Sequence, residues 1–302
     1  MSSGPRAVFG IPAYENTQHL PEALESLLSQ TYRDFAIVVI DDSTSDEPGR
    51  IFQRYAQCDP RLVYRRNQQR LGMAANWRAA FLLASESFPA MELFAWGSDH
   101  DVWHPRWLSE LVDALDADPE AVVAYPHSFR IDGDGRVLRA PWSFDTRGVT
   151  SPSRRLSLAV EGMSAGNMVY GLYRAHALAG AGIFRSVLAP DRLLLTELAV
   201  RGRFVQTADA LWYRRFAKPV SNDRQRTTLF VGRPPLHSHL PWWMVHSAVF
   251  AWTVAVRSSS APAVGRREAS AIALRHAGLS ARRAARSRRA RLVRGLRRRL
   301  VR

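Results

Sequence analysis

Short apolar runs alternate with amphipathic stretches over the first 126 residues. Five runs have the length and the β-branched or aromatic content of buried strands: residues 6–11, 35–41, 62–66, 91–96 and 121–126. Between them lie stretches with helical spacing or helix-start chemistry, at residues 12–30, 47–57, 73–85 and 104–119. Strands that alternate with helices in this way are typical of βαβ units. We therefore expect an α/β domain with a mostly parallel sheet, covered by helices on both faces.

In the second half of the chain, the alternation of apolar runs and amphipathic stretches is weaker. Residues 131–137 (IDGDGRV) are typical of a hairpin turn, and residues 204–216 favour a strand, a turn and a second strand. A helix is expected from about 190 to 201. Residues 241–256 are apolar apart from a histidine, but this run is shorter than the ~20 residues that a membrane-spanning helix requires. We therefore expect an interfacial or core helix there.

The net charge of +15 is concentrated near the C-terminus. From residue 257 onward the chain has fifteen arginines and one acid, Glu268, which leaves the preceding residues close to neutral. We expect a globular domain at 1–235, and an apolar Trp-containing helix with a basic helical tail at 236–302. The single cysteine, Cys58, excludes an internal disulfide and a Cys-based metal site. Together with an N-terminus that lacks a signal-peptide core, this predicts a cytoplasmic protein.

Polar clusters follow three of the expected strands. They are PAYEN at 12–16, DDSTSD at 41–46 and SDHD at 98–101. Parallel α/β sheets bind ligands beyond the carboxyl ends of their strands. We therefore expect these three clusters to converge on one binding site.

The third cluster places Asp99 and Asp101 on either side of His100. Two carboxylates so close together repel each other unless a positive charge lies between them. A divalent cation is the candidate, since Mg²⁺ and similar ions prefer carboxylate ligands. The alternative is that both acids are ordinary surface turn residues.

The turn after the first strand excludes two classes of nucleotide enzyme. A dinucleotide dehydrogenase needs GxGxxG at this place, and a nucleotide-sugar pyrophosphorylase needs a Gly-rich phosphate loop. The sequence GIPAYEN fits neither pattern.

Five segments, in order along the chain, resemble the bacterial inverting family-2 glycosyltransferases of the GT-A fold. The resemblance runs from about residue 6 to about residue 218, and it rests on IPAYEN, LLSQTYRDFAIVVIDDSTSD, NQQRLGMAANW, SDHD with VWHP, and APDRLLLTEL. It implies a Rossmann-like, mostly parallel GT-A sheet flanked by helices. It also implies a nucleotide-diphosphate sugar as the donor.

The resemblance places the donor's base and ribose against the first two polar clusters. Pro12, Tyr14 and Glu15 belong to the first loop, and Tyr14 matches an aromatic residue that stacks on the base. Asp42 matches a residue that accepts a hydrogen bond from the base, whereas Asp41 orients the turn. Ordinary packing for Tyr14, and an Asx-turn or helix cap for Asp42, remain the alternatives.

Two further segments match the donor's diphosphate and its metal ion. Arg70 and Gly72, with Asn76 after them, lie where relatives approach the diphosphate and sugar, although Arg70 could also be a solvated surface residue. In the DXD-like turn, Asp99 would contact the ribose or a metal-bound water, and Asp101 would bind Mn²⁺ or Mg²⁺. His100 stands where relatives often have an acid. The assignment of the metal ligand among these three residues therefore stays open, and a mixed Asp/His site would favour Mn²⁺.

Inverting transfer needs a base that deprotonates the acceptor hydroxyl. Asp191, near the start of the late helix, matches this base, with Glu197 on the same helix as its rival and a helix N-cap as the other role for Asp191. Arg215 matches a late arginine that contacts the diphosphate. Histidines 237 and 239 are expected in a loop, without a metal.

The sequence thus predicts a metal-dependent inverting glycosyltransferase that moves a sugar to a glycan, glycolipid or small-molecule acceptor. Its tryptophans and C-terminal arginines predict a peripheral contact with the inner face of the plasma membrane, as an enzyme of the cell envelope would make. A disordered solubilising tail and, less favoured, nucleic-acid binding are the other interpretations of the tail; no nucleic-acid partner is expected. The alternative function is an inactive GT-A-like scaffold anchored by its basic tail.

Overall fold

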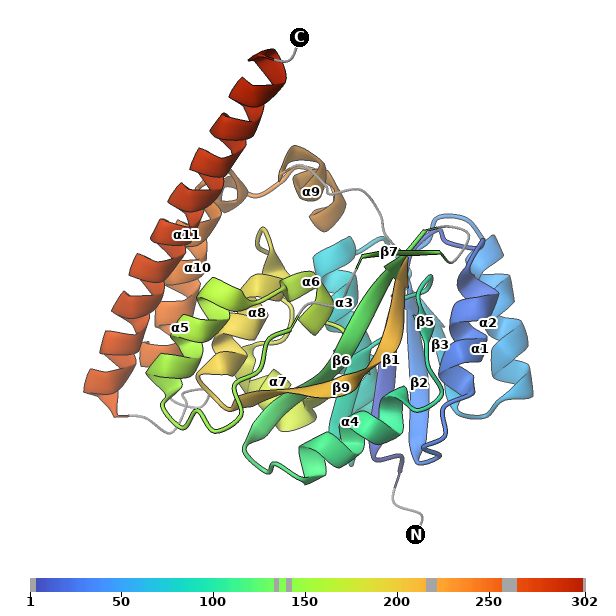
Figure 1. The fold of residues 1–302 in the computed structure, drawn as a ribbon. Coiled ribbons are helices and arrows are strands. Elements are labelled where there is room, and N and C mark those ends of the chain that lie inside the picture. The colour runs from blue at the N-terminus through green and yellow to red at the C-terminus, as the bar shows by residue number, and fades with distance from the viewer. Residues whose placement is uncertain (1–3, 133–135, 140–142, 216–221, 257–264, 301–302) are drawn as a thin grey trace.

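The computed structural model describes residues 4–132, 136–139, 143–215, 222–256 and 265–300 (Figure 1). The strands are β1 (Ala7–Ala13), β2 (Phe35–Asp41), β3 (Leu62–Arg66), β4 (Leu93–Trp96), β5 (Val102–Trp103), β6 (Ala121–Ile131), β7 (Val137–Arg139), β8 (Leu172–Arg174) and β9 (Arg203–Arg215). The α-helices are α1 (Leu20–Leu28), α2 (Glu47–Cys58), α3 (Met73–Ser87), α4 (Trp107–Asp116), α5 (Pro152–Gly162), α6 (Ala165–Met168), α7 (Ala175–Ala181), α8 (Pro190–Ala199), α9 (Asn222–Leu229), α10 (Trp242–Ala251) and α11 (Arg266–Leu300). A 3₁₀ helix, η1 (Leu236–His239), precedes α10, and a π-helix, η2 (Trp252–Val256), continues it.

In the described part of the chain, the strands form one sheet in the order β3-β2-β1-β4-β8-β6-β9-β5, and β7 pairs with β6. Strands β3, β2, β1 and β4 are parallel, with Ala7 opposite both Phe35 and Leu93. Strand β8 is antiparallel to its neighbours β4 and β6, and β5 is antiparallel to β9. The α/β fold with a mostly parallel sheet, expected from the alternating pattern, is confirmed.

Two features of the second half differ from the expectation. Strand β8 is only three residues long, too short to give a periodic signal, yet it lies between β4 and β6. Residues 203–215 form the single strand β9 instead of two strands and a turn, because pairing with β6 continues through register shifts near His127. The hairpin was predicted correctly, since Ile131 of β6 pairs with Val137 of β7; its tip, residues 133–135, lies outside the described residues.

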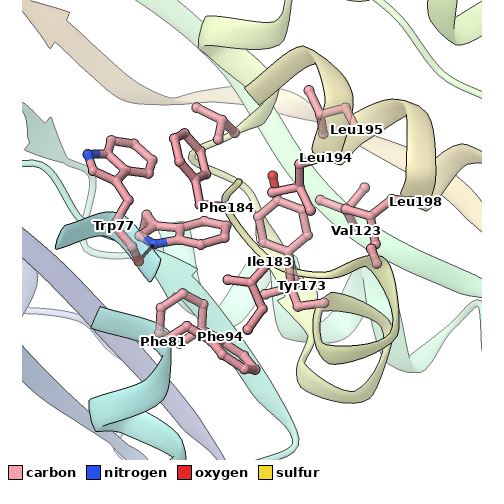
Figure 2. Close-up of a cluster of buried hydrophobic side chains, with 14 of the residues drawn as sticks. Trp77, Phe81, Phe94, Val123, Tyr173, Ile183, Phe184, Leu194, Leu195 and Leu198 are labelled. Carbon is pink, nitrogen blue, oxygen red and sulfur yellow. Dashed lines mark hydrogen bonds between the residues drawn. The ribbon is translucent and has the colours of Figure 1, made fainter. Parts of the chain in front are cut away.

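Apolar side chains fill both faces of the sheet. On one face, Trp77 of α3 stacks on Phe184 at a centroid distance of 4.7 Å, and leucines of α8 pack beside them (Figure 2). On the other face, Phe9 of β1 contacts Trp107 of α4 at 5.4 Å, together with Leu24 of α1. These two layers hold β1, β2 and β4 rigidly, which fixes the positions of the loops at their carboxyl ends.

The C-terminal helices pack against the domain through a third apolar cluster. Phe250 of α10 and Ile272 of α11 are buried there with Val160 of α5 and Leu193 of α8. The helical tail expected after about residue 257 is present as α11 from Arg266, and residues 257–264 lie outside the described residues. Among the helices that the structure describes, none combines the length and apolarity needed to cross a membrane.

Candidate active site

The loops that follow β1, β2 and β4 meet around one cavity of about 270 Å³. The cavity is lined by Pro12, Tyr14, Asn16, Asp42, Arg70, Met73, Asn76, Trp77, Asp99, His100 and Thr228. All three polar clusters expected at the carboxyl edge of the sheet therefore contribute to its surroundings. Thr228 comes from α9, which the sequence did not connect with the site.

Tyr14 and Arg70 form one wall of this cavity. The Arg70 guanidinium carbon lies 4.6 Å from the centroid of the Tyr14 ring, a cation–π contact. The Tyr14 side chain is 43% exposed, so ordinary core packing does not account for it. An exposed aromatic ring beside a cavity is suited to stacking on a flat ligand.

Asp42 is buried beside the cavity and anchors the loop that carries Arg70. Its carboxylate accepts hydrogen bonds from the backbone N–H groups of Leu71 (2.7 Å) and Gly72 (2.8 Å) and from the Asn67 side chain (2.8 Å). A carboxylate offers about four lone-pair sites, so Asp42 keeps capacity for one further donor. Gly72 adopts a φ of 81°, a conformation that favours glycine.

Asp41 and Glu15 hold the surrounding loops. Asp41 accepts from the Ser43 N–H and the Tyr64 hydroxyl, both at 2.9 Å, which fits its expected role in orienting the turn. The Glu15 carboxylate accepts from the hydroxyl and backbone N–H groups of Thr44 and Ser45. The Ser45 and Thr44 hydroxyls lower the pKa of Glu15 to about 2. Glu15 therefore joins the first loop to the second, and it is not among the residues that line the cavity.

The His100 ring lies between the carboxylates of Asp99 and Asp101. Its Nδ1 is 2.7 Å from Asp99 Oδ1, and its Nε2 is 3.8 Å from Asp101 Oδ1. Burial lowers the pKa of His100, but the hydrogen bond to Asp99 and the charge of Asp101 outweigh it and raise that pKa above its usual value. The imidazole thus occupies the place between the two acids at which the sequence predicts a positive group.

The donor atoms at this turn fit a hard divalent cation only in part. Carboxylate oxygens suit Mn²⁺ or Mg²⁺, and such ions are often held by one or two carboxylates plus substrate phosphates. Asp99 lines the cavity, whereas Asp101 is 1% exposed and accepts the Arg215 N–H at 2.8 Å. Within the described residues, no three His, Cys, Asp or Glu side chains are grouped as a protein-only metal site would require. The residues present therefore fit a cation that is shared with phosphate oxygens.

Asp191 and Glu197, the two candidate bases, differ in their surroundings. Asp191 is the second residue of α8, and burial raises its pKa. The N-cap of α8 is Ala189, so the N-cap role considered for Asp191 is wrong. Glu197 is 1% exposed and forms an ion pair with Arg185 at 3.0 Å. Burial raises the pKa of Glu197 to about 7.

Arg214, which the sequence did not single out, acts electrostatically on the acidic turn and on α8. Burial raises the pKa of both Asp101 and Asp191, and the positive charge of Arg214 opposes part of this rise. The Arg214 Nη1 donates to Asn167 Oδ1 at 3.1 Å. Arg215, the predicted site residue, instead donates to the His100 carbonyl and to Glu22 Oε2, both at 2.5 Å. The strand alternates its side chains, so only one of two adjacent arginines could face Asp191. The sequence did not show which one.

Comparisons with known proteins agree with this arrangement. The model of the family described as "Glycosyl transferase family 2" matches residues 9–169, more than half of the chain. An uncharacterized glycosyltransferase of Rickettsia conorii, RC0461, is 30% identical over 132 residues, covering 43% of this chain and 20% of that protein. Another, MJ1057 of Methanocaldococcus jannaschii, is 25% identical over 126 residues, covering 41% of this chain and 42% of that protein. The matched region thus spans less than half the length of either relative.

Solved structures share the fold at low sequence identity. S. aureus TarS 1–349 in complex with UDP superimposes with a TM-score of 0.60 at 16% identity, covering 89% of this chain and 69% of that one. The mannosyltransferase PcManGT from Pyrobaculum calidifontis, in complex with GDP-Man and Mn²⁺, gives a TM-score of 0.53 at 18% identity, with 92% and 81% covered. At these identities the likeness concerns the fold alone. The family match, which covers the site loops from β1 to α6, carries the assignment: the chain belongs to glycosyl transferase family 2 and has a GT-A-type fold.

Proposed function

We propose that this protein transfers a sugar from a nucleotide-diphosphate sugar to an acceptor hydroxyl, with inversion at the anomeric carbon. The observation that supports this most is the cavity lined by Tyr14, Asp42, Arg70 and Asp99, which come from four different loops, those after β1, β2, β3 and β4. The wall formed by Tyr14 and Arg70 is aromatic and cationic, and Asp42 and Asp99 add acidic groups to the lining. Such a set suits a ligand that is itself part base, part sugar and part diphosphate.

In this proposal the donor lies along the edge of the sheet. Tyr14 stacks on the base above Pro12, and the free lone pair of Asp42 accepts a hydrogen bond from the base, while Glu15 keeps the loop in place. Arg70 and the backbone at Gly72 approach the diphosphate. The neighbouring folds were solved with UDP and with GDP-Man and Mn²⁺, which supports this class of donor.

Asp99 and Asp101 would hold Mn²⁺ or Mg²⁺ together with the donor's phosphates. When bound, such an ion neutralises the charge that develops on the leaving diphosphate. Since His100 lies between the two carboxylates, it would have to give way or become a ligand, and the second case favours Mn²⁺. Arg215 keeps Asp101 in place through its backbone N–H; a contact of its side chain with the diphosphate would require release of Glu22.

Asp191 is the proposed general base. It takes the proton from the acceptor hydroxyl as the hydroxyl oxygen attacks the anomeric carbon from the face opposite the diphosphate. Its raised pKa makes it a better proton acceptor than an exposed aspartate. Arg214, whose charge acts on Asp191 and on Asp101, keeps Asp191 ionised near the site.

The remaining parts of the proposal concern the whole chain. Residues 1–235 would form the catalytic domain, and residues 236–302 would make a peripheral contact with the inner face of the plasma membrane. A glycan, a glycolipid or a small molecule would be the acceptor. The exposed arginines and apolar side chains of the C-terminal helices support the membrane contact.

Calorimetric titration of the full chain with UDP, GDP and dTDP, each with Mn²⁺, Mg²⁺ or EDTA, tests the donor site. We expect one diphosphate to bind, and EDTA to abolish most of that binding. Asp101→Ala should remove the metal dependence, whereas Asp209→Ala, an exposed acid on β9, should not. Metal-dependent binding that persists in Asp101→Ala would contradict the metal assignment. A folded chain that binds none of the three would favour the inactive scaffold.

A further inference from the structure

Helices α5, α10 and α11 form one flank of the molecule (Figure 1). Its two C-terminal helices and η2 carry exposed apolar side chains. Met244, Ala248 and Trp252 follow one another at intervals of four residues, so they lie along one side of α10 and its π-helical continuation. They are exposed, with Trp252 at 61%, whereas His246 and Phe250 on the other side are buried. Leu274 of α11 is 76% exposed. Helices α10 and α11 are in contact, and exposed large apolar side chains on neighbouring helices are typical of an interaction surface.

Basic side chains accompany these apolar ones. Among the side chains of α11 that the structure describes, the exposed arginines are Arg266, Arg267, Arg275, Arg282, Arg286 and Arg289. Between α11 and α5 lies a cavity of about 310 Å³ that is lined by three arginines and one carboxylate, Arg282, Arg283, Arg286 and Glu161, together with Leu279 and Ser287. Arg283 is fixed at this place because its Nη1 donates to the carbonyls of Val160 (2.5 Å) and Glu161 (2.8 Å). The cavity therefore has one rigid arginine and two exposed ones at its rim.

We propose that this flank docks on a bilayer that contains anionic phospholipid. The phosphodiester of a lipid headgroup occupies the cavity beside Arg282, Arg283 and Arg286, because guanidinium groups bind phosphate oxygens in pairs. Met244, Trp252 and Leu274 enter the boundary between headgroups and acyl chains. This inference rests on the peripheral membrane contact in the proposed function, and it adds the surface, the lipid class and the headgroup site.

Charge and apolarity together favour a lipid surface over other partners. A nucleic acid would neutralise the arginines but would leave Trp252 and Leu274 in water. A second copy of the chain would bring two arginine-rich helices together, and like charges repel. An anionic bilayer matches both kinds of side chain.

The docking surface is also joined to the helix that carries the proposed base. The ring of His246, on α10, lies with Nε2 2.7 Å from the Leu188 carbonyl oxygen, just before α8 begins. Docking would therefore leave α8 in a fixed position relative to the bilayer. A membrane-borne acceptor would then meet Asp191 at a constant height.

Vesicle flotation of the full chain tests the inference. We expect binding to vesicles of phosphatidylcholine with 30% phosphatidylglycerol, at least ~10-fold weaker binding to pure phosphatidylcholine, and loss of binding at high salt. Arg282→Gln/Arg286→Gln should weaken binding at least ~10-fold, and so should Trp252→Ser/Leu274→Ser. The matched control is Arg50→Gln/Arg54→Gln on α2, across the molecule from α11, which should bind as the wild type does (Figure 1).

Each contrary result has a definite meaning. Absence of binding to the anionic vesicles overturns the inference, and undiminished binding by Arg282→Gln/Arg286→Gln overturns the headgroup site. The surface would instead be one for nucleic acid if the chain bound RNA, if Arg282→Gln/Arg286→Gln weakened that binding, and if Trp252→Ser/Leu274→Ser left it unchanged. Nucleotide calorimetry on the same variants should be unchanged. A variant that loses vesicle binding but still binds nucleotide has therefore lost docking and not the donor site.

Discussion

At the scale of single residues, Asp191 and Glu197 differ in what their carboxylates contact. Glu197 is buried against Arg185 and Thr253, whereas Asp191 lies at the start of α8 within the influence of Arg214. The ion pair suits Glu197 to a role in stability, whereas Asp191 is the carboxylate that we propose as the base.

We predict that Asp191→Asn binds the nucleotide diphosphate normally but transfers sugar at least ~100-fold more slowly, because the amide cannot accept the proton. Glu197→Gln should keep its transfer rate and lose about 1–3 kcal/mol of unfolding free energy, because Arg185 loses its charged partner. Donor calorimetry, a transfer assay and urea denaturation measure the three quantities. An active Asp191→Asn enzyme with an inactive, stable Glu197→Gln enzyme would reverse the two assignments.

Arg214 gives a prediction about pH. Its positive charge lowers the pKa of Asp191, so its removal should raise that pKa, and the base would be protonated up to a higher pH. We therefore expect the acidic limb of the kcat/KM profile to move to higher pH in Arg214→Gln. Arg65→Gln, which removes an exposed arginine paired with Glu86, should leave the limb in place. A lower plateau with an unmoved limb would show that Arg214 acts only through packing.

At the scale of elements, α10 and α11 each contribute one buried histidine to the packing of the C-terminal helices, His246 and His276. The rings of His276 and Phe250 stack at a centroid distance of 4.4 Å, and His246 contacts the Leu188 carbonyl. Burial lowers the pKa of His246 to about 4 and that of His276 to about 3. The unfolded chain, with histidines near 6.5, therefore binds more protons than the folded chain at pH values between these limits.

Stability should accordingly be complete above pH 6.5 and fall as the pH drops from about 6.5 toward 4, by on the order of 3 kcal/mol for one such histidine. His276→Phe keeps the aromatic stack and removes one titrating group, so its stability should depend less on pH in that window. His239→Gln, at an exposed position, is the control. Urea denaturation at several pH values measures this. Equal slopes for wild type and His276→Phe would show that His276 does not titrate on unfolding.

Several elements and the place of the site could be predicted because their signals are local. Buried runs such as residues 35–41 and the polar loops that follow them identify parallel strands and their shared edge. Strand β8 could not be predicted, because three residues carry no period and their pairing depends on β4 and β6. The position of the His100 ring and the electrostatic effect of Arg214 also could not be predicted from the sequence. The first depends on side-chain geometry within a turn, and the second on how the end of β9 lies against α6 and α8.

At the scale of the whole molecule, α11 packs as part of the folded unit over its first half. Its described apolar contacts with α5, α8 and α10 come from Ala269, Ile272 and Leu279. The expected division at residue 235 remains a prediction. A self-sufficient domain at residues 1–235 would have to fold without these contacts. Val160 and Leu193, which belong to that range, are buried in the same cluster as the α11 residues.

We predict that α11 consists of a half that stabilises the fold and a half that can be removed. A chain cut after residue 264 should unfold at markedly lower temperature, because Val160, Leu193 and Phe250 lose their cover. A chain cut after Arg289 should melt like the full chain, because the last apolar contact of α11 among the side chains that the structure describes comes from Leu279. Ile272→Ala gives the same test without truncation and should cost about 2–4 kcal/mol. Calorimetric melting of the three variants decides the matter: if the chain ending at residue 264 melts like the full chain, α11 is an appendage and the division between a self-sufficient domain and a basic tail gains support.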